Sequence, residues 1–277
     1  MRRVINILIS IIATVLITFF TYKSYQSAKV LEVANKNYYE AQTDIGDIVK
    51  RKFSSVLSSL SFGMVKEEKP KVDLDKLKAE MIVAKDNANK EIKYLAISSA
   101  LLLVLYFVVG LNYFTITTAL VSLITLIFGL ITPILMIVIH KNVNYLGDIV
   151  LSFESKTIIG TISHLYHNGN FPVALAILLF SVVVPLLKTL SMIAVLVFKE
   201  LHIAQKIVSL FKHLGKWSML DVFVVSLLLV YLSAGSSENS YSQIENGTYI
   251  FMIYVILSII TSIGVNGVLK EQKSLSS

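Results

Sequence analysis

The sequence predicts an all-α integral membrane protein with six transmembrane helices. Its 277 residues are 55% hydrophobic and only 16% charged, and the mean hydropathy is +0.72. Soluble globular domains are usually far less apolar. The apolar residues gather in blocks of about 18 or more with almost no charge, which is the length that crosses a hydrocarbon core of roughly 30 Å as a helix. Alternating short strands of the membrane-barrel type are absent.

Composition also excludes several function classes. The sequence contains no cysteine, so disulfides, thiolate zinc sites, iron–sulfur clusters and cysteine nucleophiles are ruled out. Phosphate-cradling glycine loops, dinucleotide fingerprints, metalloprotease helices and nucleophile elbows are also missing. The net charge of +7 is explained by membrane anchoring and orientation rather than by a nucleic-acid partner. We therefore expect a protein that is not an enzyme and that needs no cofactor.

The first apolar block begins directly after two arginines. It runs from Val4 to about Phe20, behind Arg2 and Arg3. A signal peptide has a similar start, but the apolar stretch is long and residues 21–25 offer a poor small-residue cleavage site. We therefore assign residues 1–21 to a retained first transmembrane helix.

Residues 22–93 are polar and predict a helical hairpin outside the membrane. Apolar residues recur there at mostly three- and four-residue steps, which indicates one helical stripe. The pattern breaks at Ser61 to Gly63 and at Pro70, and Asp73 is a plausible N-cap for a second helix. The charges of both signs are interspersed, as on a solvated face. The first stripe comprises Leu31, Ala34, Tyr38, Ala41, Ile45, Ile48, Val49, Phe53, Val56 and Leu60, and the second comprises Leu74, Leu77, Met81 and Ala84.

The remaining apolar sequence holds five predicted spans. The uncharged stretch from Tyr94 to Ile139 is too long for one crossing, so it is divided by a turn near Asn112 and Tyr113, and Pro133 can kink its second helix. The predicted spans are residues 94–111, 116–139, 171–198, 217–234 and 248–269. Residues 116–269 would form a four-span domain, and residues 270–277 a short tail.

Loop charges predict the orientation. The loop of residues 199–216 carries four lysines and one acid, whereas residues 235–247 carry no lysine or arginine. Because positive residues favour the cytoplasmic side, the first loop is expected inside and the second outside. Counting spans then places both termini in the cytoplasm and the hairpin outside.

Two ionisable residues lie inside predicted spans. Lys188 is about ten residues from the cytoplasmic end of its span, and Asp221 lies about one turn into the next span. Charges at such depth cost several kcal/mol unless they are paired or hydrated, so both are candidate functional residues. Ser181, about two helical turns before Lys188, would extend a polar track, and Pro185 leaves the Ser181 carbonyl without its usual donor. The alternative is that Lys188 reaches toward the interface or that the two charges only hold adjacent helices together.

The histidines give a weaker signal. Only His164 and His167 are close enough to share a helix face, and the nearby sequence does not supply the further ligands that a metal needs. We therefore predict no metal site and a surface or interfacial role for both imidazoles. Glu154 is expected near the outer membrane boundary, where a carboxylate is ordinary.

Two stretches around these residues resemble the paraquat-inducible protein A family of bacterial inner-membrane proteins. They are LFSVVVPLLKT at residues 179–189 and KWSMLDVF at residues 216–223. The second is the family's most specific string. The resemblance extends more loosely over about residues 116–269. Well-known members carry cysteine zinc ribbons and two copies of the membrane module, whereas this sequence has no cysteine and a single copy.

The resemblance implies a part in moving lipids between the bacterial membranes. Family members work with partners that contain mammalian-cell-entry (MCE) domains and form a tunnel for hydrophobic cargo. By that resemblance, a phospholipid or other lipid would pass through a polar-lined cavity within the membrane. Its lining residues would be Lys188, Asp221, Ser181, Pro185, Trp217 and Ser218. The alternative function is an envelope-stress sensor or a scaffold that uses the helical hairpin.

Overall fold

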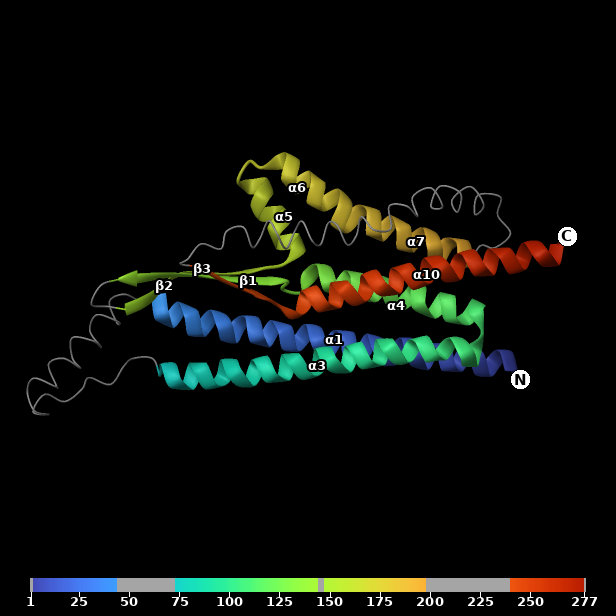
Figure 1. Ribbon diagram of the computed structural model, residues 1–277, viewed down its shortest axis with the longest axis horizontal. Coiled ribbons are helices and arrows are strands. Elements are labelled where there is room, and N and C mark those ends of the chain that lie inside the picture. The colour runs from blue at the N-terminus through green and yellow to red at the C-terminus, as the bar shows by residue number, and fades with distance from the viewer. Residues whose placement is uncertain (1, 44–72, 144–146, 198–239, 277) are drawn as a thin grey trace, which may run out of the picture.

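The computed structural model describes residues 2–43, 73–143, 147–197 and 240–276. Long helices dominate this part of the chain, and a small three-stranded sheet lies beside them (Figure 1). The expectation of an all-α fold is therefore wrong in one respect. The expectation of a mostly helical protein is confirmed.

Two long helices on either side of the undescribed residues 44–72 pack side by side and run in opposite directions (Figure 1). They are α1, Arg2–Thr43, and α3, Leu74–Val109. Toward the C-terminal end of α1, Leu31 packs with Ala84 and Ala88 of α3. The α3 helix starts at the predicted N-cap, because the carboxylate of Asp73 accepts a hydrogen bond from the Lys76 N–H at 3.1 Å. The part of the first stripe beyond Thr43 lies outside the described residues.

Helix α4, Leu111–Ile131, is shorter than its predicted span. The boundary between α3 and α4 lies at Gly110 rather than at Asn112 and Tyr113. The φ of Gly110 is 80°, a backbone angle that suits glycine. The helix then ends before Pro133 instead of continuing through it to Ile139. Because proline disfavours helical backbone in the residue before it, Thr132 adopts extended angles and the helix stops. Pro133 therefore follows the end of a helix and is not the site of a kink.

The sheet consists of β1, Leu135–Val143, β2, Gly147–Lys156, and β3, Ser240–Ile244. Its order is β2-β1-β3, and both pairs are antiparallel. Val138 of the central strand faces Phe153 on one side and Tyr241 on the other. Met136, Val138 and Val150 form a small core against α1, where the ring of Tyr39 stacks on that of Phe153 with centroids 5.3 Å apart.

A bent helical segment follows the sheet. Helix α5, Ile158–His167, and helix α6, Phe171–Ile177, meet at a protruding elbow (Figure 1). The chain then continues without interruption through a π-helical stretch, Leu178–Val183, into α7, Val184–Val197. The predicted span at residues 171–198 is therefore helical over its described length, but its winding changes in the middle.

The last helix, α10, Asn246–Ser276, packs along α4. Its start is held against the turn that follows α4, because the Gly247 N–H donates to the Pro133 carbonyl at 2.8 Å and the Thr248 hydroxyl donates to the Ile134 carbonyl at 2.8 Å. A Cβ atom at Gly247 would collide with the backbone oxygens of Thr132 and Pro133. The junction therefore requires glycine at this position.

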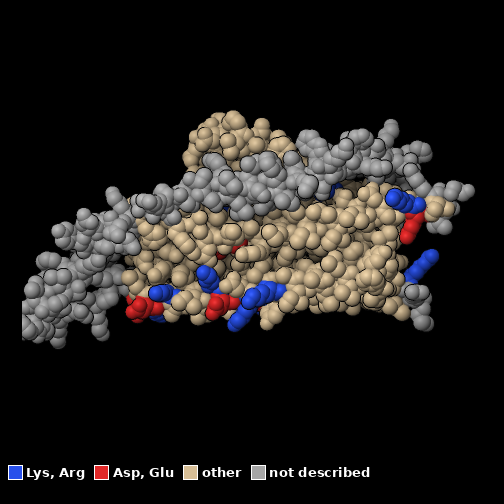
Figure 2. Space-filling view, in the orientation of Figure 1, with Lys and Arg blue, Asp and Glu red and all other residues tan. Residues whose placement is uncertain are grey.

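Five helices in the described residues are long and apolar enough to cross a membrane. These helical segments are Arg3–Thr43, Leu74–Val109, Leu111–Ile131, Phe171–Val197 and Asn246–Glu271. Figure 2 shows Lys, Arg, Asp and Glu side chains gathered toward two ends of one face, with an almost uncharged stretch between them. Many large apolar side chains in these helices are exposed, including Phe107 at 84% and Ile263 at 67%. Such surfaces are stable against lipid, so the expectation of several membrane-spanning helices is confirmed. The sixth predicted span lies outside the described residues.

Candidate functional site

Helix α7 and the π-helical stretch before it position three of the predicted site residues. Ser181 lies within the π-helical turns, and Pro185 and Lys188 lie in the first turns of α7. The Val184 N–H donates to the carbonyl of Leu179, five residues back. Pro185 has no N–H to donate, so regular α-helical pairing is interrupted at this point. The wider turns therefore lie directly before the proline.

Ser181 and Lys188 are both buried inside the apolar segment. Ser181 is 2% exposed and Lys188 is 8% exposed. Within the part of the chain that the structure describes, the Ser181 hydroxyl has no hydrogen-bond partner. An unsatisfied buried hydroxyl is costly, and polar groups at such positions commonly contact water or a ligand. Thr189, next to Lys188, instead donates its hydroxyl to the Pro185 carbonyl at 2.9 Å.

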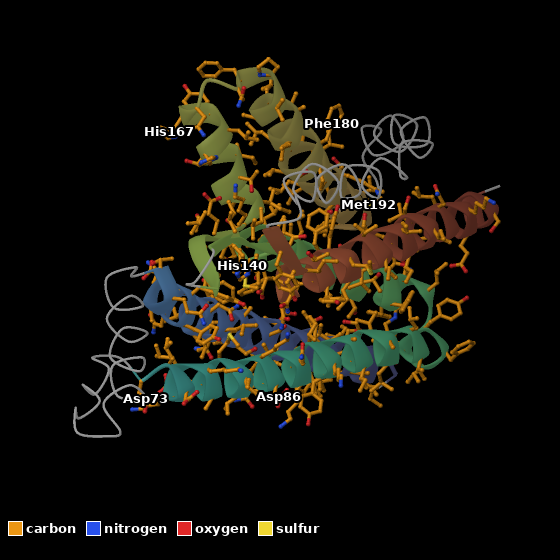
Figure 3. All side chains as sticks on the ribbon, turned by 60° about the vertical axis from the view of Figure 1, so that its left-hand side comes forward. Asp73, Asp86, His140, His167, Phe180 and Met192 are labelled. Atoms are coloured by element: carbon orange, nitrogen blue, oxygen red, sulfur yellow. The ribbon has the colours of Figure 1, made fainter. Side chains whose placement is uncertain are left out.

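The neighbouring helices supply more buried hydroxyl groups. Met192 of α7 packs with Ala119 of α4 and Val265 of α10 (Met192 is labelled in Figure 3). Ser258 on α10 is 1% exposed, and its hydroxyl also lacks a hydrogen-bond partner among residues 2–43, 73–143, 147–197 and 240–276. Most other buried hydroxyls satisfy themselves by donating one turn back, as Thr261 does to Leu257 at 2.8 Å. The interior between these helices is therefore apolar but contains hydroxyl groups.

The other predicted site residues cannot be placed. Asp221, Trp217 and Ser218 lie outside the described residues, as does the lysine-rich loop before them. The pairing of Lys188 with Asp221 therefore remains a prediction.

The histidines in the described part of the chain lie in two separate places. His164 and His167 occupy the last turn of α5, where His167 Nδ1 lies 2.8 Å from the carbonyl oxygen of Ser163. His140 lies on β1, away from both (Figure 3). Across the described ranges there is no group of three or more His, Cys, Asp or Glu side chains that could hold a metal ion.

Sequence reasoning missed a buried polar cluster at the junction between β3 and α10. Glu245 is 4% exposed, and its Oε1 accepts a hydrogen bond from Asn35 Nδ2 of α1 at 3.3 Å. The amide of Asn246 donates to the Ala88 carbonyl of α3 at 2.8 Å. These two residues therefore connect the start of α10 to both α1 and α3. The sequence feature that could have indicated this cluster is an acid and an amide, Glu245 and Asn246, directly before an apolar span in a segment without lysine or arginine.

Burial controls the ionisation of Glu245. Loss of solvent raises the pKa of its carboxyl group from 4.5 to about 7, against an opposing effect of Lys85 and with a smaller contribution from Glu32. A carboxyl group with a pKa near neutrality exchanges protons under physiological conditions. The cluster therefore places a titratable carboxyl group at the contact between the helix pair and α10.

Comparisons with known proteins agree with the motifs in the apolar region. A family model described as Paraquat-inducible protein A matches residues 113–267. The intermembrane transport protein PqiA of Escherichia coli strain K12 is 29% identical over 125 residues, which cover 42% of this chain and 28% of that protein. The proteins of the same name from Escherichia coli O6:H1 and Shigella flexneri match equally. The chain thus matches less than a third of the length of these relatives, and no solved structure matches it.

Proposed function

The chain belongs to the paraquat-inducible protein A family, and from this premise we propose that it is a membrane subunit of a bacterial envelope lipid-transport system. It would load or extract lipid for a tunnel formed by an MCE-domain partner. Three relatives that match the chain are named intermembrane transport proteins. A transport role in the membrane agrees with five apolar helices of spanning length in the described residues.

The observation that carries the proposal is the burial of Lys188 within a helix that otherwise reads as a membrane span. A lysine buried in such a helix is expensive unless it is paired or hydrated, which makes it a candidate functional residue. The adjacent π-helical turns and Pro185 give the helix a local irregularity of the kind that recurs at functional sites and bends. We propose that Lys188 and Asp221 line a hydrated cavity that admits the polar part of a lipid, without covalent catalysis.

The proposed arrangement has six spans in the bacterial inner membrane and both termini in the cytoplasm. It rests on the lysines of residues 199–216 and on their absence from residues 235–247. Reporter fusions are expected to give an extracytoplasmic signal at Ser237 and within residues 67–75. A cytoplasmic signal at either place would refute the orientation.

The direct test of the function is lipid transfer by the purified protein. The protein and its candidate MCE partner would be reconstituted into donor vesicles, and acceptor vesicles would then be added. The protein is expected to accelerate the movement of labelled phospholipid to the acceptor vesicles above the rate of protein-free vesicles. Mass spectrometry of the purified protein should also detect co-purified native phospholipid. If neither transfer nor bound lipid is found while the protein is folded and associated with its partner, the transport proposal fails.

A second candidate function is supported by the polar half of the first two helices. In α1 and α3 the packing continues past the apolar segments, where Leu31 meets Ala84 and Ala88, and the sheet packs against α1 there. This assembly would suit an extracytoplasmic sensor or a scaffold that clamps a partner. An adjacent gene for an MCE-domain protein favours transport, whereas an adjacent kinase or cyclase gene favours sensing.

A further inference from the structure

A cavity of about 590 Å³ lies between α1, β2 and the start of α5. Its lining contains none of the described residues proposed to act in the transport path, namely Ser181, Pro185 and Lys188. Six of its lining residues are charged, namely Lys29, Glu32, Lys36, Glu40, Glu154 and Lys156. This volume is within the range of pockets that hold small ligands.

The charged residues form ion pairs on opposite walls of the pocket. On α1, Lys29 Nζ lies 2.8 Å from Glu32 Oε2, and on β2, Lys156 Nζ lies 2.8 Å from Glu154 Oε2. Each pair is formed within one element, so each wall presents a cation and an anion. The Glu32 and Lys156 side chains are only 24% and 22% exposed. Both walls can therefore contact a ligand that carries both signs of charge.

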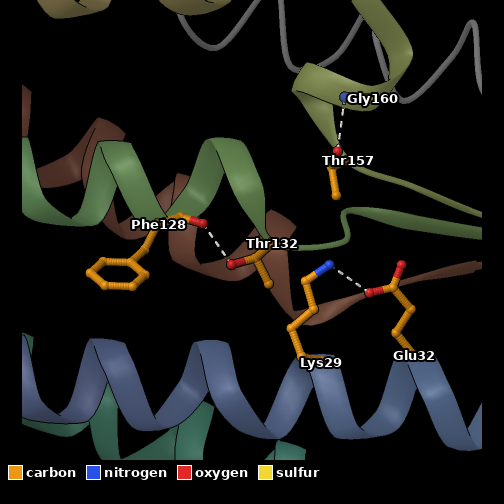
Figure 4. A network of polar contacts seen from close by, with 6 residues as sticks. All are labelled: Lys29, Glu32, Phe128, Thr132, Thr157 and Gly160. Carbon is orange, nitrogen blue, oxygen red and sulfur yellow. Dashed lines mark hydrogen bonds and ion pairs between the residues drawn. The ribbon is translucent and has the colours of Figure 1, made fainter. Parts of the chain in front are cut away.

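The start of α5 adds a third wall. Figure 4 shows Lys29 and Glu32 extending from α1 toward the turn at Thr157 and Gly160. There the Thr157 hydroxyl accepts a hydrogen bond from the Gly160 N–H at 2.9 Å and caps the helix. The positive end of the α5 dipole faces the pocket, which favours a negative group near that turn.

The pocket lies where the apolar surface of α1 gives way to charge. Exposed apolar side chains are frequent on α1 between Val4 and Phe19. Val30 and Val33, next to the pocket residues in the sequence, are also exposed. Ile159 on α5 is 47% exposed next to the capped turn. A charged cavity at the end of an apolar surface has the arrangement that a lipid requires, since its headgroup is polar and its chains are not.

We propose that this pocket binds the headgroup of a zwitterionic phospholipid, a phosphodiester joined to an ammonium group. The phosphodiester lies against Lys29, Lys156 and the start of α5, and the ammonium lies against Glu32 and Glu154. A purely anionic headgroup would draw the two lysines away from their carboxylates and leave those negative charges without a partner, which disfavours it. This inference rests on the proposed lipid-transport function, because it names the cargo class.

Binding to the intact purified protein in detergent tests this proposal. Calorimetric titration would compare short-chain phosphatidylethanolamine, short-chain phosphatidylglycerol and soluble glycerophosphoethanolamine. Phosphatidylethanolamine is expected to bind at least about tenfold more tightly than phosphatidylglycerol, because one charge-assisted contact contributes about that much. It is also expected to bind at least about tenfold more tightly than glycerophosphoethanolamine, because the soluble compound lacks the apolar chains. Glycerophosphoethanolamine carries the same headgroup without acyl chains, so it tests whether the pocket binds a lipid or a soluble zwitterion.

Variants locate the binding at the pocket. Lys156→Met and Glu154→Gln are each expected to weaken phosphatidylethanolamine binding about tenfold, and Glu154→Gln should also reduce its preference over phosphatidylglycerol. Lys78→Met is the matched control, because Lys78 is an exposed lysine on α3 outside the pocket. A melting curve for each variant shows that it is folded, and Lys29→Met replaces Lys156→Met if the latter does not fold.

Three results would overturn the proposal. These are equal binding of the two lipids, unchanged binding in folded pocket variants, and equally tight binding of glycerophosphoethanolamine, which would assign the pocket to a soluble ligand. The results that would refute the pocket assignment differ from those that would refute the proposed transport function. Vesicle transfer that shows no headgroup preference would overturn the pocket assignment alone, whereas selective binding without any transfer would overturn the transport role alone.

Discussion

Replacement of Lys188 by alanine is expected to reduce lipid transfer to the rate of protein-free vesicles while the protein remains folded. Lys188 is 8% exposed and lies two turns after the buried Ser181 hydroxyl. If the ammonium group contacts the polar part of a passing lipid or the water around it, its loss removes that contact and leaves an apolar barrier. Asp221→Ala is expected to have the same effect. Transfer between vesicles measures the result, and the free energy of unfolding should change by about 1 kcal/mol or less.

The matched control is the residue before Lys188. Leu187 is 56% exposed, so Leu187→Ala shortens a side chain on the outer face of the same helix and should leave transfer near the wild-type rate. A purely structural role makes a different prediction. Both alanine variants would then melt early, and a double variant with Lys188→Asp and Asp221→Lys would recover stability. That pattern would refute a transport role for the two residues.

The helical part of the fold could be predicted because apolar length is a strong signal. The start of α3 at Asp73 and the helical character of residues 171–197 follow from capping chemistry and from uncharged apolar runs. The sheet could not be predicted in the same way. The first half of β1, Leu135 to Ile139, is as apolar as the helix before it, so the two read as one block. The partner strand β3 lies about 100 residues later in the chain. Pro133 marked the boundary, but proline is compatible with both a kink and a helix end.

In the candidate site, too, some residues could be identified from the sequence and others could not. Lys188 was identifiable because a charge inside an apolar run is conspicuous in the sequence itself. Glu245 was not, because it stands at the edge of a span, where an acid is ordinary. Its burial depends on Asn35, which is 210 residues away in the chain. The mixed-charge pocket likewise joins α1 to residues more than 100 positions later, and no local pattern specifies that contact.

The stability of the protein is expected to fall as pH rises from about 4.5 to about 7, and Glu245→Gln should remove this dependence. The pKa of the Glu245 carboxyl group is raised from 4.5 to about 7, mainly by burial. Between these values the folded state keeps a proton that the unfolded state has released. Stability therefore decreases through this interval and becomes constant above it, with a total change of at most about 3 kcal/mol.

The neighbours of Glu245 explain why a glutamine is a suitable replacement. Asn35 donates to the carboxyl oxygen, and a glutamine oxygen can accept the same hydrogen bond without carrying charge. Lys85 favours the ionised carboxyl group, while Glu32 disfavours it, so the nearby charges offset part of each other. The variant should consequently match the wild type at pH 4.5 and be more stable than it at pH 8.

Melting curves recorded in detergent between pH 4.5 and pH 8 measure this effect. Glu80→Gln is the matched control, since Glu80 is an exposed acid on α3 and its loss should leave the pH dependence of the wild type unchanged. Parallel curves for the wild type and Glu245→Gln would show that the buried carboxyl group does not control stability. If the curves instead diverge above pH 5, ionisation of Glu245 weakens the contact of α1 and α3 with the start of α10. Protonation of Glu245 would then tighten the junction at the start of α10, and loss of the proton would loosen it.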